Sequence, residues 1–215
     1  AVSWGMGSSL QIYMNTYFWE FKSIMLASYL GIYVLSTLSA YLIVPRLVQV
    51  IEKKTILLIA ISFAALIPPI PIILFINNLL PDTGTWNLFY ATIPFVYVAN
   101  TCLSSSAIIR ESMLGDISDE VELESGIGQQ GLMFASSSLI GKLNTGLGIL
   151  MAGITLEFIN FPQGTDVTPS AENIFNLAMV QGPLVAILMI IPFGIFSLYK
   201  IDRYRHQQIL AKLNH

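Results

Sequence analysis

The residue best suited to chemistry in this sequence of 215 residues is Lys142, which interrupts a long apolar segment between Leu132 and Phe158. It lies about ten residues inside that segment, roughly 15 Å deep if the segment is a helix that crosses a membrane. An ammonium at that depth costs about 2.5–3.5 kcal/mol even on the lenient insertion scale. We therefore expect Lys142 to line a wet substrate or cation path, with Ser138 and Thr145 on the same helical face. The alternative is a buried structural ion pair.

A second group of reactive side chains is the acidic run that contains Asp116, Asp119 and Glu122. Together with the bases Arg46 and Arg110, these carboxylates are expected to form ion pairs that open and close one mouth of a pathway. The alternative is a solvated charged loop. A metal site is not expected, because the carboxylates would supply oxygen ligands alone and would lack a shaped cavity.

The composition indicates the environment in which these residues lie. The chain is 54% hydrophobic and 11% charged, its net charge is −3, and its mean hydropathy is +0.70. Such values are typical of a membrane protein and give no basic surface for nucleic acid. The one cysteine, Cys102, has no partner for a disulfide or a metal, and neither of the serine runs 104–106 and 136–138 has a histidine near it. We expect neither an enzyme nor a resident cofactor.

The elements that must position the reactive residues are apolar segments long enough to cross a bilayer. We predict an all-α membrane protein with a bundle of six transmembrane helices, at 1–21, 24–44, 55–76, 86–109, 132–158 and 176–199. The first segment is the least apolar and carries Gln11, Asn15 and Thr16, which indicates a helix that faces an internal cavity. Asn15 is therefore a candidate pathway residue beside Lys142, and Asn100 of the fourth predicted span is another.

Two further patterns concern orientation and packing. Arg46, Arg110 and several bases of the tail follow even-numbered spans, so the positive-inside rule predicts that the chain ends in the cytoplasm. We expect a multi-pass protein of the cell membrane, the inner or plasma membrane. The small residues Gly141, Thr145, Gly148 and Ala152 share a helical face and predict that another helix packs closely there.

The stretch from Asp116 to Lys142 resembles the signature region of the glycoside-pentoside-hexuronide:cation symporters, the melibiose-permease-like branch of the major facilitator superfamily. The pattern consists of an Asp-x-x-Asp-x-x-Glu motif, two glycines and a lysine in the following helix; the matching residues are Asp116, Asp119, Glu122, Gly126, Gly131 and Lys142. The resemblance implies that the chain is the C-terminal half, helices seven to twelve, of a transporter with twelve helices.

The same resemblance implies a cation-coupled symporter of a sugar or related small solute that works by alternating access. The sodium or proton site would lie mainly in the N-terminal half, which this chain lacks and which would be its partner in the bilayer. Gly128 and Gln130 depart from the family's Arg and Glu, and Ala107 replaces an aromatic residue that stacks on the sugar. A lysophospholipid-type amphiphile is therefore an alternative solute. A free-standing assembly or sensor protein with six helices is the alternative of another class.

Overall fold

The structure, a computed structural model, describes residues 2–162 and 168–189, and these residues form helices joined by short turns, without strands. In chain order the elements are α1 (Val2–Tyr13), the π-helix η1 (Met14–Phe18), α2 (Ser23–Val50), α3 (Lys53–Leu66), α4 (Pro69–Ile76), α5 (Trp86–Ser125), α6 (Gln130–Phe158), α7 (Ala171–Met179) and the π-helix η2 (Val180–Leu184). The predicted all-helical membrane fold is confirmed.

Five helical segments of the described chain are long and apolar enough to cross a membrane: Ser23–Val50, Lys53–Ile76, Trp86–Ser125, Gln130–Phe158 and Ala171–Met189. The first predicted span, 1–21, corresponds to the shorter unit of α1 and η1 and is not among these five. The sixth predicted span, 176–199, begins earlier than expected, at Ala171, and its residues 190–199 lie outside the described part.

Two helices extend beyond their predicted ends. α2 continues through Pro45 to Val50, because neighbouring helices in a membrane bundle tolerate a proline that would stop a helix in water. α5 continues through the acidic run to Ser125 and ends where Gly126 adopts φ 71° and donates its N–H to the Glu122 carbonyl. The acidic residues 116–124 thus belong to a helix, whereas the sequence indicated a joint between helices.

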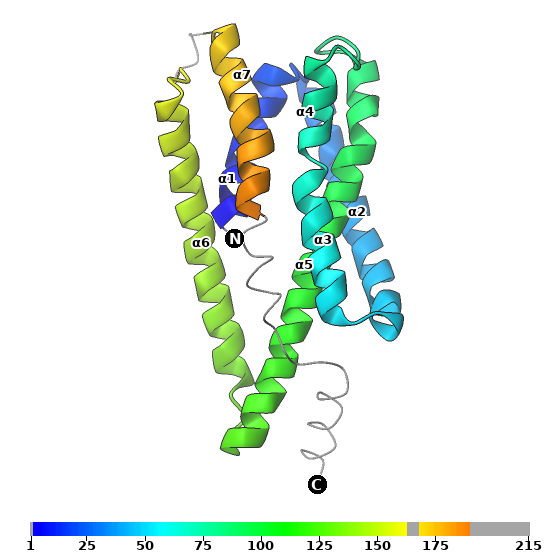
Figure 1. The fold of residues 1–215 in the computed structure, drawn as a ribbon, viewed down its shortest axis with the longest axis vertical. Helices are drawn as coiled ribbons and strands as arrows, with labels where there is room; N and C mark the ends of the chain where they lie inside the picture. Colours follow the sequence, from blue (N-terminus) through cyan, green and yellow to red (C-terminus); the bar gives the residue numbers. More distant parts are fainter. Residues whose placement is uncertain (1, 163–167, 190–215) are drawn as a thin grey trace.

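The helices form two groups that stand side by side (Figure 1). α6 packs on α1, with α7 beside them, while α5 packs on α2 and α3. The lower ends of α5 and α6 meet in a hairpin that reaches below the other described helices (Figure 1). Gln11 of α1 and Asn15 of η1 lie on the side of their group that faces α2 to α5.

The contact between α1 and α6 is close because glycines lie at the crossing. A Cβ atom added to Gly148 of α6 would overlap the Val2 carbonyl oxygen and would lie 2.7 Å from the Met6 nitrogen. Gly5 of α1 is equally close to the backbone of Thr145. Close helix packing at the predicted strip is confirmed at Thr145, Gly148 and the buried Ala152. Gly141 lies outside the contact, with nothing within 4 Å of such a Cβ atom.

Candidate functional site

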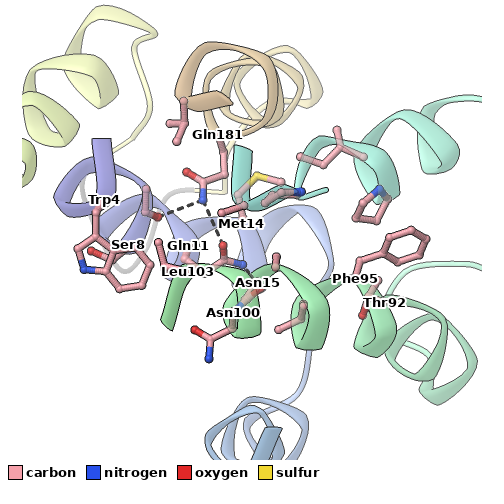
Figure 2. Close-up of a pocket in the computed structure, with 18 of the residues that line it drawn as sticks. Trp4, Ser8, Gln11, Met14, Asn15, Thr92, Phe95, Asn100, Leu103 and Gln181 are labelled. Atoms are coloured by element: carbon pink, nitrogen blue, oxygen red, sulfur yellow. Dashed lines mark hydrogen bonds between the residues drawn. The ribbon is translucent and has the colours of Figure 1, made fainter. Parts of the chain in front are cut away.

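The described helices line a half-open cavity of about 270 Å³ between the two groups (Figure 2). It receives side chains from α1, η1, α2, α3, α4, α5, η2 and the helical residues that follow η2, Val185 and Met189. Its polar and aromatic lining residues are Ser3, Trp4, Ser8, Gln11, Asn15, Trp19, Tyr29, Tyr33, Thr92, Phe95, Asn100 and Gln181. None of the described lining residues carries a formal charge.

Three carboxamides on one wall form a continuous hydrogen-bonded chain. Gln181 Nε2 donates to the Gly7 carbonyl at 3.0 Å and to Gln11 Oε1 at 3.1 Å, and Gln11 Nε2 donates to Asn15 Oδ1 at 2.9 Å. Figure 2 shows Gln181 reaching from η2 across to Gln11. The π-helical turns contribute to this geometry, because Asn15 lies in η1 and Gln181 in η2.

The facing wall is polar along α2 and α5. Asn100 Nδ2 donates to the hydroxyl of Ser36, and the hydroxyls of Tyr29 and Thr92 are 3.1 Å apart. The Asn100 amide nitrogen thus donates to α2. Its Oδ1 is not a buried oxygen without a partner. Together the two walls surround the cavity with carboxamides, hydroxyls and aromatic rings, a set that recognises uncharged polar molecules through hydrogen bonds and ring stacking.

The structure places the predicted pathway residues in two locations. Asn15 of η1 and Asn100 of α5 are both among the lining residues, and the Asn100 carboxamide points toward α2 (Figure 2). Lys142, Ser138 and Thr145 lie on α6 and are not among the lining residues. The side chains of Lys142 and Ser138 are exposed, and the Thr145 hydroxyl donates to the Gly141 carbonyl in its own helix.

The predicted ion-pair residues have other partners than those expected. Asp116 is paired with Lys53 of α3, whose Nζ lies 2.7 Å from both carboxylate oxygens. Arg46 donates to the Leu42 carbonyl, and Arg110 is exposed with its nearest carboxylate on the adjacent Glu111 at 3.5 Å. Asp119 accepts a hydrogen bond from Gln130, and the Glu122 carboxylate lies beside Gly128.

Replacing Lys53 by Met is expected to lower the free energy of unfolding by about 1–3 kcal/mol. The side chain of Asp116 is 11% exposed, so removal of this cation leaves a largely desolvated carboxylate. The expected loss is below the value of about 3–5 kcal/mol for fully buried pairs, because the side chain of Lys53 is 29% exposed. Thermal unfolding of the full-length protein in detergent measures the change.

The exposed pair of Arg110 and Glu111 provides the control for this prediction. Arg110→Met should change the stability by less than about 0.5 kcal/mol, because exposed ion pairs contribute little. Equal effects of Lys53→Met and Arg110→Met would show that the pair of Lys53 and Asp116 does not hold α3 to α5.

A cavity lined by uncharged polar groups inside a bundle of membrane-spanning helices is an arrangement typical of membrane proteins that bind and carry small molecules. The comparison of sequences agrees with this class. Residues 1–203 match the family described as MFS/sugar transport protein, and the chain therefore belongs to that family. No curated protein and no solved structure matches the chain significantly. The family match supports the major facilitator membership expected above, and it points to a transporter rather than an enzyme.

Two residues of these sites, Gln181 and Lys53, were not identified from the sequence. Gln181 stands in an apolar segment before Gly182 and Pro183, and this break in a predicted helix was the available signal. Lys53 follows Glu52 at the start of α3, and its pairing with Asp116 depends on how α3 packs against α5.

Proposed function

We propose that the chain forms one half of a secondary symporter that couples a sodium or proton gradient to the movement of a sugar or a related uncharged solute. The observation that carries the proposal is the cavity, because its carboxamides and aromatic rings suit hydroxyl groups and the apolar faces of a sugar ring. Membership of the MFS/sugar transport protein family supports it. In this proposal the membrane is the cell membrane, and the chain ends on its cytoplasmic side.

The volume of the cavity favours a small solute. About 270 Å³ is just below the range of about 300–1,000 Å³ that is typical of small-molecule sites. In the proposal the N-terminal half covers the remaining surface of the solute, and rocking of the two halves exposes the site to each side in turn.

The coupling ion is assigned to the N-terminal half. None of the described residues that line the cavity is a carboxylate, the usual ligand for sodium and the usual carrier of a transported proton. On this view Asp119 and Glu122 act as cytoplasmic gating groups together with Arg46 and Arg110, beside Asp116, which Lys53 pairs within this half. The cytoplasmic end of α5 would pair with the other half in one state and separate from it in the other.

The proposal is tested by uptake into proteoliposomes that contain the full-length protein. Labelled sugars and lysophospholipids are compared with and without an imposed sodium or proton gradient. Gradient-driven accumulation of a sugar supports the proposal, whereas accumulation of lysophospholipids alone would show that the solute is an amphiphile and not a sugar. If folded protein accumulates none of these solutes under either gradient, the protein is an assembly or sensor protein and not a transporter.

Asn100→Leu is expected to raise the KM for the transported sugar about three- to tenfold, because one hydrogen bond to the solute contributes about 0.5–1.5 kcal/mol. The matched control is Asn87→Leu, which changes an exposed Asn in the first turn of the same helix. Initial uptake rates over a range of solute concentrations give both KM values. A similar KM in both variants would show that Asn100 does not bind the solute.

A further inference from the structure

The orientation of the Gln181 carboxamide is fixed by a group that can only accept hydrogen bonds. The Gly7 carbonyl lies 3.0 Å from Gln181 Nε2, and Gln11 Oε1 lies 3.1 Å from the same nitrogen. Turning the carboxamide over would place its oxygen against the Gly7 carbonyl oxygen, even if Gln11 turned over as well. The observed orientation leaves Gln181 Oε1 buried without a partner. An unpaired buried oxygen is less unfavourable than an oxygen pressed against another oxygen.

This fixed orientation determines that of the next two carboxamides. Gln11 must present Oε1 to Gln181, so its Nε2 is directed to Asn15 Oδ1 at 2.9 Å. Asn15 must then use its oxygen within the chain, which leaves Nδ2 as its remaining polar atom. Asn15 lines the cavity, and Nδ2 is not among the buried atoms that lack a partner. Nδ2 is therefore the group of Asn15 that is left to donate a hydrogen bond to a solute in the cavity.

We infer that Gln181 is a positioning residue, which acts through Gln11 to make Asn15 present an N–H donor to the cavity. The inference rests on the proposed function in one respect: the solute would be recognised at this wall through an oxygen that accepts a hydrogen bond. Without the backbone carbonyl of Gly7 at one end, the three carboxamides could all reverse, and Asn15 would offer an acceptor instead.

The test observes the carboxamides directly and needs no solute. Side-chain amide resonances of Asn15 and Gln11 are recorded for the full-length, ¹⁵N-labelled protein in lipid nanodiscs and are assigned through their loss in Asn15→Ser and Gln11→Met. Gln181→Met keeps the length of the side chain and removes both hydrogen bonds. We expect the Asn15 resonances to shift or split, because Gln11 then samples both orientations.

Val185→Ala is the matched control for packing, because Val185 also lines the cavity and contacts the region of Gly7 without a hydrogen bond. A change at Asn15 in Gln181→Met, and not in Val185→Ala, supports the positioning role. An unchanged Asn15 in folded Gln181→Met overturns it, and equal changes in both variants overturn it in favour of a packing effect. Because the measurement is made without solute, its result is independent of whether the uptake experiment succeeds.

Discussion

Replacing Gly148 by Ala is expected to separate α6 from α1 and to destabilise the protein strongly. The new methyl group would overlap the Val2 carbonyl and would lie 2.8 Å from the Cα atom of Gly5, so backbone rather than a flexible side chain must move. Overpacking typically costs about 1–3 kcal/mol, and rigid backbone contacts place this site at the upper end. The gain in helix propensity of about 1 kcal/mol does not offset it.

A Gly→Ala substitution at another position of α6 should stabilise the protein or leave its stability unchanged. A Cβ atom on Gly153 meets nothing within 4 Å, so Gly153→Ala adds helix propensity without a clash. In thermal unfolding of the full-length protein in detergent, Gly148→Ala should melt several degrees below the parent and Gly153→Ala at or above it. Similar melting temperatures for the two variants would mean that α1 and α6 are not held at this crossing.

Lys142→Ala is expected to abolish gradient-driven accumulation of the solute while leaving the fold intact. Lys142 is twelve residues after the start of α6 and sixteen before its end, so it lies close to the middle of the helix. Its side chain is exposed on the described structure, and α1 occupies a neighbouring face of α6. A charge at this depth is unfavourable against lipid, so we propose that it faces the aqueous path between the two halves.

Two readouts separate this role from a structural one. The ammonium makes no ion pair with the described residues, so its removal should leave the melting temperature of the full-length protein nearly unchanged. Lys142→Arg keeps the charge and should retain part of the accumulation that Lys142→Ala loses. Coupled uptake that persists in Lys142→Ala would exclude the residue from the pathway, and a large loss of stability would favour the buried ion pair.

In the proposed symporter, the face of α6 that carries Lys142 would meet the N-terminal half. The large apolar residues around it include Leu139 and Leu143, which are each 60% exposed to the surroundings of the described helices. They require lipid or another protein surface as neighbours. A lysine among them fits a boundary between the two halves better than a lipid-facing surface, which is why its test needs the full-length protein.

The sequence by itself determined the class of fold, because only helices satisfy their own backbone hydrogen bonds inside a membrane and apolar segments of sufficient length are visible in the residues. The polar character of the first segment likewise singled out Gln11 and Asn15, since amides in an apolar bundle require partners. Local chemistry also marked the small-residue strip around Gly148, where close packing is found.

The tertiary structure decided which distant residues meet. Gln181 reaches Gln11 and Gly7 across more than 160 positions of sequence, and Lys53 reaches Asp116 from another helix. Helix ends also depended on context, because Pro45 is accommodated within a bundle and the acidic run after Arg110 continues α5 until Gly126. Periodicity and composition describe each helix separately, whereas rotation and depth of one helix against another arise from packing, and these select the partner of each polar side chain.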